Sequence, residues 1–242
     1  MNNLMKSQFF KIKRNRCLYI MLGVVLFMAF VGVTMASNMK AEGNVVTGVD
    51  VVFNSYGGDV CAMIVGILAT FILCMDFTSG SIKQIIGKGV NRVKYTMASI
   101  FSVSITATIM LALLGLISFG FGIVIFGHTG SIEISSLGYL ILGLIVIALN
   151  YTSYIAMITM AFRKISISLI FAILSPSLLD IFVRLISPVT DASVLSLNEN
   201  VEKMISVETA FGERMASFGV MGILTVIMAV VALSIFKKKD IQ

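Results

Sequence analysis

The sequence predicts an all-α membrane protein with six transmembrane helices, both termini in the cytoplasm and a single domain over residues 1–242. Three observations lead to this fold class. Of the 242 residues, 58% are hydrophobic and 12% are charged. The mean hydropathy is +1.01, and apolar runs of about 20 residues recur along the chain. Soluble domains average about 25% charged residues, so this chain has too few polar side chains to cover a water-facing surface. It is also too hydrophobic to be disordered.

Six segments are long and apolar enough to cross a bilayer, which takes about 20 predominantly apolar residues. They cover residues 17–36, 60–75, 98–126, 137–162, 165–186 and 216–236. The first follows a basic leader and ends in small residues, as a cleavable signal sequence would. Its apolar run is long for such a signal, so we keep it as a span.

Lys and Arg residues divide unequally between the connections. Fourteen of the 18 fall on one side of the membrane, in residues 1–16, 77–95, 163–164 and 237–239, whereas ten of the 12 acidic residues fall on the other. Cytoplasmic loops carry the excess of Lys and Arg, so both termini are expected in the cytoplasm. The net charge of +6 is a topology signal, and no basic domain outside the membrane indicates a nucleic-acid partner.

Residues 1–16 are expected to form an amphipathic helix on the inner leaflet. Leu4, Phe9 and Ile12 fall on one side at helical spacing, while Lys13 and Arg14 project elsewhere. Such a helix rests its apolar side on lipid and its cations on anionic headgroups. The alternative is a basic flank that only fixes the topology.

The cytoplasmic segment 77–95 predicts a short helix, capped by Ser79 or Ser81 and ended by glycines. Isoleucines give this helix an apolar stripe. A short exposed helix with such a stripe suits docking into a groove on a partner protein, and the alternative is a helix resting on lipid. The candidate contact residues are Ile82, Lys83, Ile85, Ile86 and Arg92.

The residues that catalysis or metal binding would need are scarce, so we expect no enzyme activity and no cofactor or metal site in this chain. There are three cysteines and one histidine, His128, without metal-ligand spacing. Gly87-Lys88 resembles the end of a phosphate-binding loop, but that motif requires Gly where Ile82 stands and Ser or Thr where Gly89 stands. Any ATP hydrolysis must therefore come from another chain.

Ionisable residues near the bilayer are functional candidates because charge in lipid is costly. Asp180 and Arg184 lie one helical turn apart, late in the fifth predicted span. They predict either an ion pair that anchors the helix end or a part of an outer gate. Asp76 lies at the inner end of the second span, where we expect it to pair with a nearby Lys or Arg.

A polar patch in the fourth span contains Asn150, Tyr151 and Tyr154. Polar side chains in a span usually face other helices, so the patch predicts interhelical hydrogen bonds or a substrate pathway. Outside the membrane, residues 187–215 alternate charged and apolar residues and predict one or two short helices before the last span. Residues 37–59 read as a more loop-like connection.

The motif Gly80-Ser-Ile-Lys83, followed by Gly89-Val-Asn-Arg92-Val-Lys-Tyr95, resembles the ABC-2 type transporter permeases. The ending Phe236-Lys-Lys-Lys-Asp-Ile241 is also similar to that family. More narrowly, the chain resembles the small six-span permeases of Gram-positive bacteria, including those of lantibiotic and bacitracin self-protection systems. This resemblance implies a location in the plasma membrane of a Gram-positive bacterium.

The same resemblance implies partners and a function. Two permeases, identical or related, would form one pathway above two copies of a P-loop ATPase that binds ATP and Mg. Residues 78–95 would contain the coupling helix that touches the ATPase. The function implied is outward movement of an amphipathic or antimicrobial peptide. The alternative is a stand-alone immunity protein or a secondary carrier without ATP coupling, although no carboxylate lies at mid-membrane depth, as an ion-coupled carrier would need.

Overall fold

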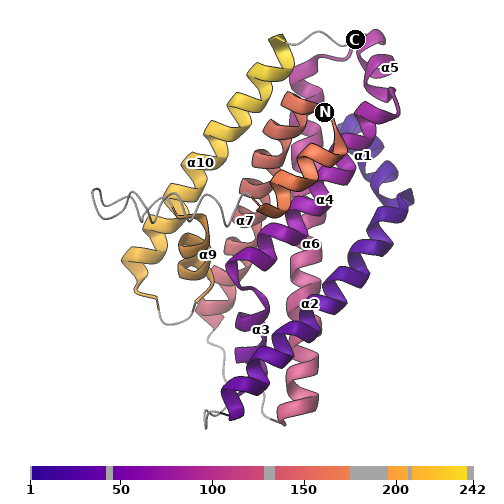
Figure 1. Cartoon of the computed structure of the whole chain (residues 1–242). Coiled ribbons are helices and arrows are strands. Elements are labelled where there is room, and N and C mark those ends of the chain that lie inside the picture. Colours follow the sequence, from indigo (N-terminus) through magenta and orange to yellow (C-terminus); the bar gives the residue numbers. More distant parts are fainter. Residues whose placement is uncertain (1, 42–45, 128–133, 175–195, 207–208, 239–242) are drawn as a thin grey trace.

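The computed structural model describes residues 2–41, 46–127, 134–174, 196–206 and 209–238, and every regular element in these ranges is an α-helix (Figure 1). The labelled helices are α1 (Asn2–Arg14), α2 (Arg16–Ala41), α3 (Gly48–Ser55), α4 (Gly58–Thr78), α5 (Ser81–Gly87), α6 (Arg92–Phe126), α7 (Ile134–Phe162), α9 (Leu197–Ile205) and α10 (Phe211–Lys238). A further apolar helix covers Ile165–Leu174.

Five helices are long and apolar enough to cross a membrane: α2, α4, α6, α7 and α10. They coincide with the first four predicted spans and the last one, and each extends beyond the predicted bounds. Of the fifth predicted span, the helix Ile165–Leu174 is described, and residues 175–186 lie outside the described residues. Asp180 and Arg184 also lie outside the described residues, so a sixth span and an Asp180–Arg184 pair stay predictions. His128 lies outside the described residues as well.

The N-terminal amphipathic helix and a short helix before the last span are both present, as α1 and α9. α9 begins at a serine cap, where the hydroxyl of Ser196 accepts the N–H of Glu199. The side-chain amide of Asn198 donates to Asp59 at the start of α4, at 3.0 Å. This bond places α9 beside the beginning of the second span.

The loop-like interpretation of residues 37–59 is wrong, because Gly48–Ser55 form the helix α3. A reciprocal capping box starts α3: the Thr47 N–H donates to Asp50 at 2.7 Å, and the Asp50 N–H donates to the Thr47 hydroxyl at 3.4 Å. The helix packs closely on α6. A Cβ at Gly122 would lie 2.7 Å from the Cα of Gly48, so this approach of the two backbones requires glycine.

The two ends of the bundle are held by separate apolar clusters. At one end, Ile82, Tyr95, Met160 and Phe236 join α5, α6, α7 and α10. Val33, Ala36, Val46, Val51 and Phe126 join α2, α3 and α6 at the other. Figure 1 shows the start of α1, the short α5 and the end of α10 at the same end of the molecule.

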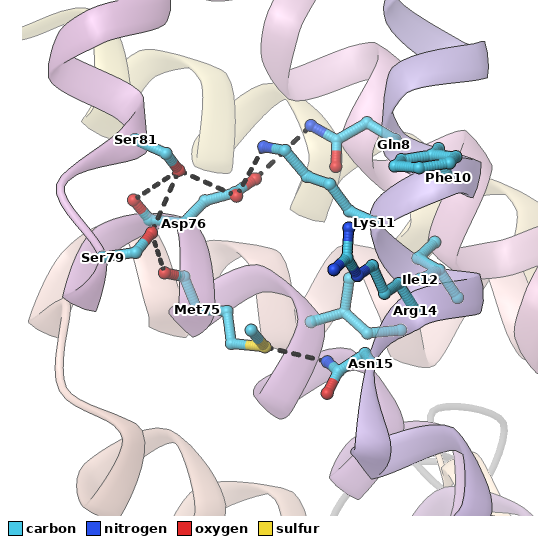
Figure 2. Close-up of a pocket in the computed structure, with 11 residues that line it drawn as sticks. Gln8, Phe10, Lys11, Ile12, Arg14, Asn15, Met75, Asp76, Ser79 and Ser81 are labelled. Atoms are coloured by element: carbon cyan, nitrogen blue, oxygen red, sulfur yellow. Dashed lines mark hydrogen bonds and ion pairs between the residues drawn. The ribbon is translucent and has the colours of Figure 1, made fainter.

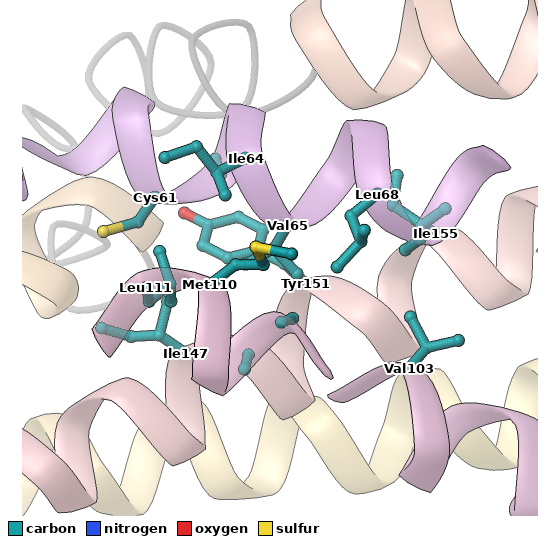
Figure 3. Packing of buried hydrophobic residues seen from close by; sticks show 14 of the residues in the cluster. Cys61, Ile64, Val65, Leu68, Val103, Met110, Leu111, Ile147, Tyr151 and Ile155 are labelled. Atoms are coloured by element: carbon teal, nitrogen blue, oxygen red, sulfur yellow. The ribbon is translucent and has the colours of Figure 1, made fainter. Parts of the chain in front are cut away.

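The centre of the bundle is formed by α4 and α7. In the apolar stretch of each of these helices 67% of the residues are buried, whereas in α10 the share is 11%. Figure 3 shows the ring of Tyr151 from α7 among Val65 of α4 and Met110 of α6. α10 leaves Ile223 and Val226 more than 60% exposed. An apolar face of this kind suits lipid or another membrane helix.

Truncating a central side chain should therefore destabilise the fold far more than truncating an outer one. Leu68 is 1% exposed and Ile223 is 64% exposed. We expect Leu68→Ala to lower the free energy of unfolding by about 2–5 kcal/mol, because it leaves a cavity. Ile223→Ala should change it by less than about 0.5 kcal/mol. Thermal unfolding in mild detergent measures both, and equal losses would contradict this assignment of the core.

Candidate functional site

The carboxylate of Asp76 accepts hydrogen bonds from three neighbouring helices. From α1, Lys11 Nζ lies 2.9 Å from Oδ1 and Gln8 Nε2 lies 3.4 Å from Oδ2. From α5, the hydroxyl of Ser81 donates to Oδ1 at 3.1 Å, and the hydroxyl of Tyr95 on α6 donates to Oδ2. Asp76 is 7% exposed. We call these five residues the Asp76 joint, and Figure 2 shows four of them.

The local sequence explains how Ser81 reaches Asp76. α4 ends at Thr78, and Gly80 adopts a left-handed conformation with φ of 67°, which glycine accepts without steric cost. This turn brings Ser81 back over the last turn of α4. The expected serine cap of α5 is wrong, because its N-cap is Gly80, without a side-chain bond.

Electrostatics explain why α1 is needed at this point. Asp76 lies in the last turn of α4, and the C-terminal end of a helix carries a partial negative charge that disfavours an anion. Lys11 supplies the compensating positive charge in the only ion pair found among the described residues. The expectation that Asp76 pairs with a nearby Lys or Arg is confirmed, with a partner 65 residues away in the chain.

The apolar side of α5 is directed into its own chain. Ile82 is 2% exposed and packs in the cluster with Tyr95, Met160 and Phe236. Ile85 and Ile86 are partly buried against the same cluster. The outer edge, formed by Gln84 and by Lys88 at the C-cap, is exposed. Ile82 therefore anchors α5 within the bundle, and contact of Ile85 and Ile86 with a partner stays a prediction. The side chain of Lys83 lies outside the described part.

Arg92 fastens the start of α6 to the end of α10. Its guanidinium lies 3.4 Å from each of the carbonyl oxygens of Phe236 and Lys237. A cation is favoured there because the last carbonyls of a helix lack partners within it. Arg92 thus closes the end of the bundle next to α5, and its contact with a partner stays a prediction.

The predicted polar patch of α7 lies inside the bundle. The side-chain amide of Asn150 donates to the carbonyl oxygen of Met221 at 3.1 Å and to the hydroxyl of Thr225 at 3.2 Å, both on α10. Tyr151 is 2% exposed and Tyr154 is 9% exposed. Asn150 therefore bonds α7 to α10, while contact of the patch with a substrate stays a prediction.

Sequence reasoning missed Gln8 and Tyr95 as partners of Asp76. Both contacts are non-local, at separations of 68 and 19 residues, and neither side chain has a spacing that marks it. Among the described residues, no group of three or more His, Cys, Asp or Glu side chains could hold a metal ion. The contacts of Asp76 and Arg92 join neighbouring helices at this end of the bundle.

Five long apolar helices around a buried central core define a multi-pass membrane protein. A family model described as ABC-2 family transporter protein matches residues 4–176. This match covers more than two thirds of the chain and the whole Asp76 joint, so the chain belongs to the ABC-2 transporter family, as its membrane permease component. Permeases of this family pair with an ATPase subunit. No curated protein matches the sequence.

Removing the cation of the Asp76 joint should destabilise the fold. Lys11→Met leaves a nearly buried carboxylate without its ion pair, and we expect a loss of about 1–3 kcal/mol in the free energy of unfolding. Lys13→Met, at an exposed position of the same helix, should change it by less than about 0.5 kcal/mol. Thermal unfolding in mild detergent compares the two, and a Lys11 variant as stable as wild type would show that the ion pair adds no stability.

Proposed function

We propose that this permease couples ATP hydrolysis in a separate subunit to the outward movement of an amphipathic, peptide-like cargo. The observation that carries the proposal is the position of α5. This helix stands where α4, α6, α7 and α10 meet, with its inner face in the Ile82 cluster and its first residue in the Asp76 joint. Its outer edge, with Gln84 and Lys88, is exposed. A partner that presses on this edge would move several spans together.

The mechanism follows from how α5 is held. Ser81 bonds α5 to Asp76 of α4, and Ile82 packs with side chains of α6, α7 and α10; packed side chains transmit displacement. Two P-loop ATPase subunits that bind ATP and Mg would close beneath two permeases, identical or related, and each would displace one α5. Asn150, which bonds α7 to α10, would help these two helices to move as a pair.

The orientation is part of the proposal. Basic side chains gather at the α5 end, where Lys88, Lys94, Lys164, Lys237 and Lys238 are all exposed. Excess Lys and Arg mark the cytoplasmic side, which is also where an ATPase would bind. Both termini would then be cytoplasmic and α9 extracellular. The peptide cargo and the plasma membrane of a Gram-positive bacterium are supported by the motif resemblance of residues 80–95.

A charge reversal on the outer edge of α5 tests the docking role. We expect Lys88→Glu to lower the recovery of the ATPase by about tenfold or more, because a wrong-signed charge in an interface costs several kcal/mol. The measurement is co-purification of the tagged chain, expressed with its neighbouring genes, in mild detergent. Lys40→Glu, an exposed position at the end of α2, is the matched control and should recover the ATPase as wild type does.

The same experiment separates the competing functions. Full ATPase recovery by Lys88→Glu would reject docking through this edge. Ile85→Lys would then test the half-buried side of α5, provided that its melting temperature matches that of wild type. A stable wild-type chain that recovers no ATPase and shows no ATP-dependent transport would reject the exporter and favour a stand-alone immunity protein or a carrier.

A further inference from the structure

A pocket of about 310 Å³ opens between α1, the end of α4 and the start of α5. Its size falls at the lower end of the roughly 300–1,000 Å³ typical of small-ligand sites. Figure 2 shows that α1 forms one wall and that α4 and the α4–α5 turn form the other. Four residues of the Asp76 joint line this pocket, whereas Gln84 and Lys88 on the exposed edge of α5 do not, so a ligand here and a partner on that edge would use different surfaces.

The polar part of the pocket is positively charged. Arg14 is exposed, and the side chain of Lys11 is 37% exposed although it pairs with Asp76. An ammonium has three donors, so Lys11 keeps two that Asp76 does not use. The carboxylate itself presents little charge to the pocket, because its two oxygens accept four hydrogen bonds and its side chain is 10% exposed.

The other part of the pocket is apolar and open to the side. Phe10 lines it and is 67% exposed, and Met75 lines it from α4 and is 44% exposed. Asn15, also in the lining, joins α1 to α2, where Tyr19 and Ile20 continue the apolar surface at 68% and 64% exposure. Cations beside exposed apolar side chains are complementary to an amphiphile with an anionic head.

We propose that this pocket binds the phosphate headgroup of an anionic phospholipid. Arg14 and the two unused donors of Lys11 hold the phosphate, since charge-assisted hydrogen bonds to phosphate are the strong ones. The acyl chains lie along Phe10 and the exposed side chains of α2. Because Lys11 also pairs with Asp76, the bound lipid contacts the residue that ties α1 to the end of α4.

The test counts the lipids that the purified full-length chain retains, by native mass spectrometry in mild detergent, after exposure to a mixture of phosphatidylglycerol and phosphatidylcholine. Wild type should retain phosphatidylglycerol preferentially. Arg14→Gln should lower that retention about fivefold, the effect expected for one basic residue at a membrane surface. Lys94→Gln removes an exposed cation at the same end but outside the pocket, and it should retain lipid as wild type does.

Three results would overturn the proposal. Equal losses of phosphatidylglycerol retention in Arg14→Gln and Lys94→Gln would show that the lipid is attracted by the positive surface as a whole and not by the pocket. Displacement of phosphatidylglycerol by inorganic phosphate, with no effect of Phe10→Gln on lipid retention, would show a site for free anions. Unchanged lipid retention in Arg14→Gln, together with loss of the ATPase in co-purification, would show a contact with the partner subunit. The melting temperature of each variant verifies that it folds.

Discussion

The structure depends on keeping one carboxylate charged in an unfavourable place. Asp76 lies at the C-terminal end of a membrane span and is 7% exposed, so both the helix dipole and the apolar surroundings oppose its charge. Donors from α1, α5 and α6 converge on it to offset that cost. One anion therefore joins three helices to the end of α4, and none of the three can move away without leaving a buried charge less well compensated.

For the proposed transport mechanism, the important feature is how α5 is attached to the bundle. Ser81 ties its first turn to Asp76, and Ile82 holds its inner face against α6, α7 and α10. Arg92 then binds the start of α6 to the last carbonyls of α10. In the proposed mechanism, a displacement of α5 would act on α4 through Ser81 and on α6, α7 and α10 through the Ile82 cluster. This is the behaviour that an ABC-2 permease needs if a separate subunit supplies the energy.

Hydropathy and charge were enough to predict the five long helices, the amphipathic α1 and a Lys or Arg as the ion-pair partner of Asp76. They could not identify Lys11, Gln8 and Tyr95, because these contacts depend on how the helices pack. An isoleucine stripe predicts a buried face without telling whether the chain itself or a partner buries it, and Ile82 faces its own chain. α3 was missed because its apolar run is short, although Thr47 and Asp50 have the spacing of a capping box.

Lys11 connects the two proposals about this end of the molecule. Its ammonium pairs with Asp76 and also lines the pocket that we assign to an anionic headgroup. A phosphate beside it competes for the same ammonium and repels the carboxylate of Asp76, so the ion pair is held less firmly. The strength of the Lys11–Asp76 ion pair would then depend on the lipid at the membrane surface. This ion pair links α1 through Asp76 to Ser81 of α5. Coupling and lipid binding should therefore be linked through a single side chain, and variants of Lys11 should affect both, whereas variants of Arg14 should affect lipid binding first.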